Sequence, residues 1–117
     1  MLDLVVAQLK TGPWVRVVPF GSAQPSLPYL VVREEGGNFR VTGHHKPDYY
    51  VDLRAYMRKE VYNLLQGRTL TGSGARIITI REVPGSLTEC RALSDDGSIS
   101  IERVFYSPDI LTIGDIF

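Results

Sequence analysis

The stretch KPDYYVDLRAYMRKEVYNLLQG, residues 46–67, decides the fold of this chain because it has the period of one long amphipathic helix. At ~100° per residue, apolar side chains three and four positions apart fall on one stripe, as a core-facing helix requires. Those side chains are Tyr50, Leu53, Met57, Val61, Leu64 and Leu65. Pro47 suits the first helical turn and Gly67 supplies a left-handed cap. The stretch therefore predicts a rod of about 19 residues, about 28 Å long at ~1.5 Å per residue.

The outward face of this helix carries tyrosines at positions where a solvated helix usually carries Lys and Glu. Tyr56 is expected to point most nearly away from the core. Tyr49 and Tyr62 lie at the margins of the far side, which leaves open whether they lean back on the sheet. Arg54 and Arg58 flank the apolar stripe four residues apart, so they repel rather than pair. Because aromatic side chains with a polar tip are enriched at interfaces, we predict that these five residues contact another protein.

The flanking sequence predicts strands and one further short helix. Residues 2–10 have apolar side chains at helical spacing, although the β-branched pair Val5-Val6 keeps a strand as the alternative. Strands are predicted at residues 14–20, 29–33, 39–42, 76–82, 87–93 and 98–106, with a tight turn at 95–97. We therefore expect a single α+β domain over residues 1–117, in which one mostly antiparallel sheet of about five to six strands packs against the long helix and a short N-terminal helix.

Composition limits the classes of function. A chain of 117 residues has the length of one domain, and its 13 Lys and Arg balance 13 Asp and Glu. A protein that binds phosphate backbones usually carries a basic excess, so nucleic acid is not expected as the main partner. The longest apolar runs fall far short of the ~20 residues that span a bilayer, and the first residues lack the features of a signal peptide. One cysteine, Cys90, fits an intracellular, reducing environment.

No motif in the sequence indicates catalysis. Adjacent side chains in extended backbone point apart, so His44 and His45 would not share a metal, and we expect them in a polar loop before the helix. Residues 72–74 lack the Lys-Ser/Thr of a phosphate loop, and the acidic pair at 95–96 is explained as a turn by Gly97. Cys90 has no histidine at a recognisable spacing and is expected as a buried thiol. We predict a protein that is not an enzyme and has no cofactor or metal.

Two further features bear on partners. Arginines occur in three predicted strands, and Arg81 and Arg103 would line one sheet face with Arg91. That face would suit a small nucleic-acid-binding or regulatory module, which is the alternative function, although such a sheet also needs exposed aromatic side chains. The segment 108–117 is too apolar for a solvated arm, so we expect it to dock on this domain or on a partner through Ile113, Ile116 and Phe117.

The predicted elements follow the order helix, strand, proline-containing loop, hairpin, long helix and further strands. In this order and in four local sequences, the chain resembles the small tail-completion or tail-terminator proteins of long-tailed bacteriophages. The local sequences are PYLVV at 28–32, HKPDYY at 45–50, EVYNLLQG at 60–67 and DDGSISIER at 95–103. The resemblance implies a virion structural protein of the head–tail junction, or neck, assembled in the host cytoplasm, with no catalytic residues to carry over. It also implies a ring, commonly a hexamer, that ends growth of the tail tube and joins it to the capsid connector. The apolar segment 108–117 departs from the family's pattern and leaves the geometry of ring closure open.

Overall fold

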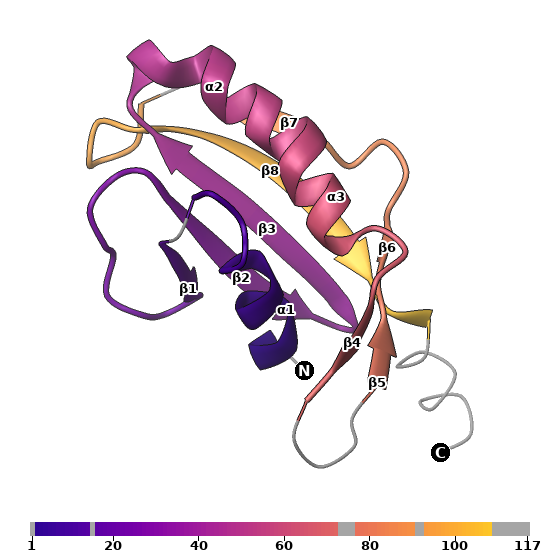
Figure 1. Ribbon diagram of the computed structural model, residues 1–117. Coiled ribbons are helices and arrows are strands. Elements are labelled where there is room, and N and C mark those ends of the chain that lie inside the picture. Colours follow the sequence, from indigo (N-terminus) through magenta and orange to yellow (C-terminus); the bar gives the residue numbers. More distant parts are fainter. Residues whose placement is uncertain (1, 15, 73–76, 91–92, 109–117) are drawn as a thin grey trace.

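The computed structural model describes residues 2–14, 16–72, 77–90 and 93–108. Within them the chain is α+β, with a six-stranded mixed sheet, a separate two-stranded sheet, one long helix and a short N-terminal helix (Figure 1). The predicted fold class is confirmed. The described residues contain no helix that is long and apolar enough to cross a bilayer.

The helical segments are α1 (Leu2–Leu9) and the long helix, which consists of η1 (Pro47–Tyr49), α2 (Tyr50–Ala55), η2 (Tyr56–Glu60) and α3 (Val61–Leu65). The strands are β1 (Val17–Pro19), β2 (Tyr29–Glu35), β3 (Asn38–His45), β4 (Thr69–Thr71), β5 (Ile77–Thr79), β6 (Arg81–Glu82), β7 (Thr88–Cys90) and β8 (Ile99–Tyr106). The main sheet has the order β1-β2-β3-β8-β6, and β7 also pairs with β8. The pairing of β1 with β2 is parallel, and the other pairings are antiparallel.

The long helix crosses one face of the main sheet, and α1 lies on the same side (Figure 1). Alternate residues of the strands, such as Phe39, Val41 and Phe105, are fully buried beneath it. A Cβ on Gly43 would lie 2.8 Å from Leu53 Cδ1, so this glycine lets helix and sheet approach closely. Gly67 has φ +68°, as the predicted left-handed cap requires.

The structure corrects three predicted boundaries. His44 and His45 belong to β3 rather than to a loop, because β8 pairs with both of them and β2 also pairs with His44. This tertiary pairing outweighs their polar character. The predicted strand 76–82 is divided into β5 and β6, which join different sheets. β4 was not predicted, since its short sequence TLT becomes a strand only by pairing with β5.

Candidate interaction surfaces

Tyr56 is not on the outward face, and its prediction as a contact residue is wrong. Its side chain is 3% exposed and stacks on Trp14, with ring centroids 4.4 Å apart and planes 7° from parallel. The prediction from helical periodicity assumed that only the sheet covers the long helix. The segment after α1 covers this flank of the helix as well, so that a Cβ on Gly12 would lie 3.1 Å from the Tyr56 hydroxyl oxygen. Burial raises the pKa of the Tyr56 hydroxyl above its ordinary value.

A series of rings continues from Tyr56 to the surface. Trp14 meets His45 edge-on at 5.1 Å, and His45 stacks on Tyr49 at 4.6 Å. The backbone N–H of Lys46 donates to His45 Nδ1 over 2.8 Å, which fixes the imidazole orientation. Burial lowers the pKa of His45, an effect that the nearby Asp52 carboxylate partly offsets. The neutral imidazole is therefore favoured between the two aromatic rings.

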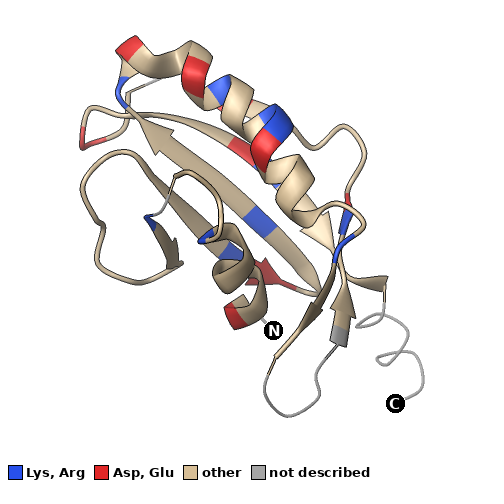
Figure 2. Cartoon of the chain, in the orientation of Figure 1, with Lys and Arg blue, Asp and Glu red and all other residues tan. Residues whose placement is uncertain are grey.

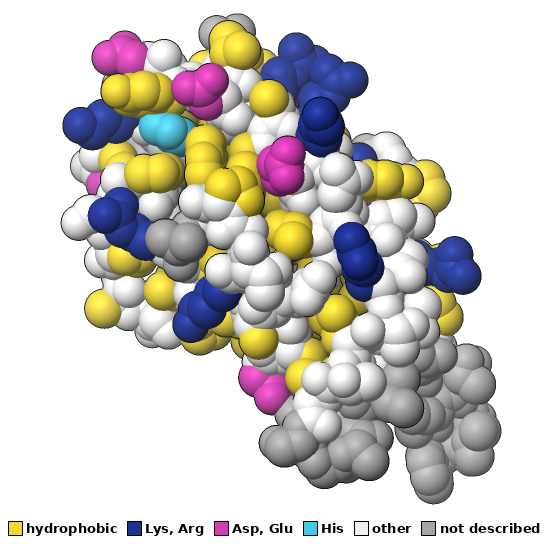
Figure 3. All heavy atoms as spheres, viewed as in Figure 1, with side chains coloured by type: hydrophobic (Ala, Val, Ile, Leu, Met, Phe, Trp, Pro, Cys, Tyr) yellow, Lys and Arg dark blue, Asp and Glu magenta, His cyan; other side chains and the backbone are white. Residues whose placement is uncertain are grey.

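The outer end of this series is an exposed surface where the long helix begins. Tyr49 is 48% exposed and borders a shallow pocket of about 310 Å³ with Leu27, Pro28 and His45. We call Trp14, Pro28, His45 and Tyr49 the aromatic patch. Figure 3 shows hydrophobic side chains gathered in this part of the molecule. Lys46 also lines this pocket. Partly exposed aromatic rings of this kind are enriched at the centre of protein interfaces.

The opposite flank of the helix is held to the sheet by Arg103. Its guanidinium forms two hydrogen bonds with the Glu82 carboxylate, both 2.9 Å, and lies 4.9 Å from the centre of the Tyr62 ring. The same group donates to the main-chain oxygens of Met57 and Arg58 at 2.9 and 2.8 Å. These oxygens belong to the π-helical segment η2, whose widened turn disturbs the regular α-helical bonding pattern. Arg103 thus compensates for an irregularity in the helix.

This arrangement corrects the prediction of an arginine-bearing sheet face. Arg81 pairs with Tyr106 and Glu82 with Phe105 in the β6–β8 register, so Arg81 and the helix-facing Arg103 point to opposite faces. Arg76 and Arg91 lie outside the described residues. The guanidinium of Arg103 is occupied by protein groups and only 11% of its side chain is exposed. Arg81 and Arg103 therefore do not share the sheet face that was predicted for the nucleic-acid alternative.

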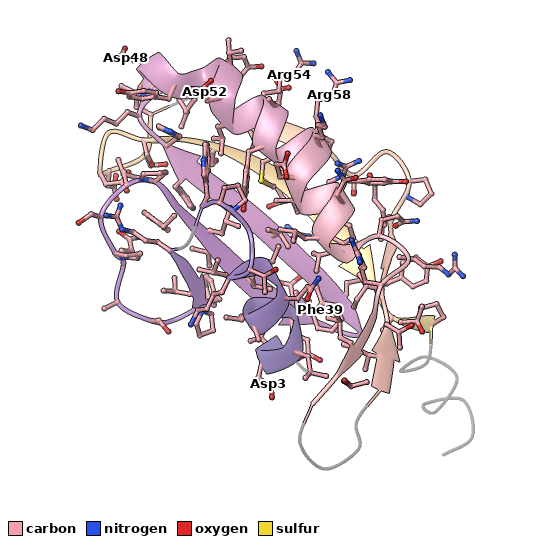
Figure 4. All side chains as sticks on the ribbon, in the orientation of Figure 1. Asp3, Phe39, Asp48, Asp52, Arg54 and Arg58 are labelled. Atoms are coloured by element: carbon pink, nitrogen blue, oxygen red, sulfur yellow. The ribbon has the colours of Figure 1, made fainter. Side chains whose placement is uncertain are left out.

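The exposed part of the Arg103 flank contains the other predicted contact residues. Val51 is 74% exposed and Tyr62 37%, and Arg54 and Arg58 lie between them along the chain. Figure 4 shows Arg54 and Arg58 directed away from the sheet, and Figure 2 shows Lys and Arg positions on the middle of the long helix. Arg54 Nε lies 2.7 Å from a carboxylate oxygen of Glu89 on β7, which also accepts a hydrogen bond from Tyr50. We call Val51, Arg54, Arg58 and Tyr62 the arginine patch.

The sheet face opposite the long helix has a groove of about 500 Å³, lined in part by Arg33, Arg40, His44 and Glu102. The arginines are matched by acids, because Arg33 contacts Glu35 at 2.5 Å and Arg40 contacts Glu102 at 3.5 Å. Glu102 lies opposite Thr42 in the register, two positions from the His44–Ser100 pair and on the same face of the sheet. The groove therefore offers hydrogen-bonding groups. Among the residues that the structure describes, no hydrogen bond joins His44 to a carboxylate of the groove.

His44 itself is part of a structural cluster. Its ring stacks on Tyr29 at 4.8 Å, and the Tyr29 hydroxyl donates to Asp96 Oδ2 over 3.3 Å. Asp96 Oδ1 also accepts hydrogen bonds from the amide and hydroxyl of Ser98, which close the predicted turn. Burial lowers the pKa of His44, and Asp96 opposes this shift. Among the residues that the structure describes, no three or more His, Cys, Asp and Glu side chains gather where a metal ion would bind.

The structure thus divides the predicted contact residues. Tyr49 belongs to one flank of the long helix, whereas Tyr62, Arg54 and Arg58 belong to the other, and Ile113, Ile116 and Phe117 lie outside the described residues. Sequence reasoning did not include Val51, although its apolar side chain between polar neighbours was a usable signal. The place of Trp14 depends on tertiary packing, which no local pattern reveals. No protein-family model, curated protein or solved structure matches this chain.

Proposed function

We propose that this chain is a non-enzymatic structural protein that assembles with copies of itself through its long helix. The observation that carries this proposal is the presence of two chemically different exposed patches on opposite flanks of one helix. A closed ring requires such heterologous contacts, in which one patch of a subunit meets a different patch of the next. The aromatic patch offers flat rings, and the arginine patch offers guanidinium groups, which stack well on aromatic faces.

Within that class, we propose that the chain is a tail-completion or tail-terminator subunit of the head–tail junction of a long-tailed bacteriophage. Support comes from the order α1, β1, proline-containing loop, β2–β3 hairpin, long helix and β8, which is the order behind the family resemblance. In this role a ring, commonly hexameric, ends the tail tube and joins it to the capsid. Its partners are the neighbouring connector and tail-tube proteins.

Localisation in the particle tests this proposal directly. Gold-labelled antibody against the chain is applied to virions from a host that produces it, and label is counted by electron microscopy. We expect label at the junction between capsid and tail. Label along the tail, on the capsid shell or on no particle would contradict the proposed role.

A pair of variants tests the two patches. Arg58→Glu reverses a charge in the arginine patch, and Arg81→Glu makes the same change at an exposed position on β6. We expect Arg58→Glu to reduce incorporation into particles at least tenfold, because carboxylates are repelled by the negative face of an aromatic ring. Arg81→Glu is expected to be incorporated normally. Equal incorporation of both variants would contradict the use of this patch.

A further inference from the structure

An acidic surface borders the aromatic patch at the start of the long helix. Asp48 and Asp52 are exposed there, and Figure 4 shows both at this end of the helix. Asp52 lines a shallow pocket of about 350 Å³ together with Trp14, and its carboxylate opposes the lowering of the His45 pKa by burial. Among the residues that the structure describes, neither aspartate forms a salt bridge. The aromatic patch is therefore suited to a cationic group.

The arginine patch contains a cation that is suited to this surface. Arg54 is held by the Glu89 carboxylate at 2.7 Å on its own subunit. Arg58 is exposed, and within the described part of the chain its guanidinium forms no salt bridge. Lys59 lines the pocket of Asp52 as well as the pocket of Arg58, so it lies between the two flanks. Arg58 is therefore the cation of this patch that can reach a neighbouring subunit without giving up a partner.

We propose that the Arg58 guanidinium of one subunit binds between the Tyr49 ring and the Asp52 carboxylate of the next subunit. A guanidinium is planar, so it can stack on an aromatic face while its N–H groups donate to a carboxylate. The two receiving groups lie close together, because Tyr49 stacks on the His45 ring and Asp52 is near enough to influence the same ring. The inference rests on the proposed function, since it identifies the contact through which copies of the chain assemble.

Charge complementarity along one helix favours a second copy as the partner. Asp52 and Arg58 are six residues apart, about 9 Å along the axis, so every chain carries both halves of the pair. Only residues three or four positions apart face each other on a helix, so these two do not pair within one subunit. Each therefore remains available to a neighbouring copy, and identical subunits can repeat the contact from one to the next.

Complementary charge reversal tests the pair. Full-length Asp52→Lys and Arg58→Glu chains are purified separately and then mixed, and self-association is measured by sedimentation velocity. We expect each variant alone to associate at least tenfold more weakly than the wild type, because each forms a like-charge contact. The mixture is expected to recover wild-type association. In the mixture the introduced lysine meets the introduced glutamate, and the two unchanged side chains form the original pair. Recovery also shows that both variants are folded.

Matched reversals elsewhere serve as controls. Asp95→Lys in the exposed turn and Arg81→Glu on β6 are expected to associate like the wild type, alone or mixed. Wild-type association of Arg58→Glu alone, or a mixture that associates no better than its components, overturns the pair. A wild type that stays monomeric contradicts both the pair and self-assembly. Recovery that stops at two subunits supports the pair and contradicts the ring. Recovery by a protein that does not label the head–tail junction supports the pair and contradicts the phage role.

Discussion

The two flanks of the long helix are attached to the sheet by different chemistry. On one flank Tyr56, Trp14, His45 and Tyr49 form a series of rings that runs from the core to the surface. On the other, one largely buried guanidinium, with 11% of the side chain exposed, joins Glu82 to two main-chain oxygens of the helix. Rings can remain stacked when their outermost member is exposed, whereas a buried charge requires all its partners in place. We therefore expect the ring flank to tolerate substitution at its outer end and the charged flank not to tolerate loss of Arg103.

Loss of Arg103 is expected to have the largest effect on stability. Arg103→Ala leaves Glu82 as a largely buried carboxylate without its partner and removes the hydrogen bonds to the Met57 and Arg58 oxygens. Breaking a buried pair from one side costs about 3–5 kcal/mol. Urea unfolding measures this loss, with the exposed Arg81→Ala as a matched control that is expected to change stability by no more than about 0.5 kcal/mol. Similar stabilities for the two variants would contradict a structural role for Arg103.

Removal of the central ring on the other flank is expected to cost somewhat less. Trp14→Ala removes the contacts to both Tyr56 and His45. Fully buried Phe or Trp residues lose about 3–5 kcal/mol on truncation to Ala, and the partial exposure of Trp14 lowers the expectation to about 2–3 kcal/mol. Urea unfolding followed by circular dichroism gives the value. A cost larger than that of Arg103→Ala would reverse the order of the two flanks.

As the pH falls, protonation of the histidines is expected to lower the free energy of unfolding before the carboxylates become protonated. Burial lowers the pKa of His44 and His45 in the folded chain, so the unfolded chain binds more protons below its own pKa of about 6.5. The free energy of unfolding should therefore be constant with respect to these groups above pH 7 and decrease as the pH falls through about 6.5. The pKa of Asp96 is lowered instead, by its hydrogen bonds to Ser98, and its contribution is lost only at pH values below about 4.

The measurement is urea unfolding from pH 8 to 5 for the wild type and for His44→Gln with His45→Gln. We expect the slope between about pH 6.5 and 5 to become smaller in the double variant, since the two imidazoles no longer take up protons on unfolding. An unchanged slope would show that neither histidine is held neutral by the fold.

The smallest effects on stability are expected at the exposed ends of the two flanks. Tyr49→Ala and Tyr62→Ala each remove one ring contact, to His45 and to Arg103, worth about 0.5–1 kcal/mol. Their effect on assembly should be much larger, at least tenfold, because each side chain is a main component of its patch. Thermal unfolding and sedimentation velocity measure the two quantities on the same samples. A loss of assembly that only parallels a loss of stability would argue against a contact role.

The sequence predicted most of the fold because its main elements have local signals. The apolar stripe, Pro47 and Gly67 specify the long helix, and alternation along Ile99 and Ile101 specifies β8. Tyr56 was misplaced because a helical projection contains no information about the segment after α1. Arg103 was assigned to an exposed face because the β6–β8 register and the π-helical turn are properties of the folded chain.

Hydroxyl-radical footprinting measures whether the exposed ends of both flanks become covered on assembly. The chain is labelled in its free form and within purified particles, and modification of each tyrosine is measured by mass spectrometry. We expect Tyr49 and Tyr62 to lose most of their reactivity in the particle, while the buried Tyr56 is little modified in either state. Equal reactivity of Tyr49 and Tyr62 in the two states would contradict it.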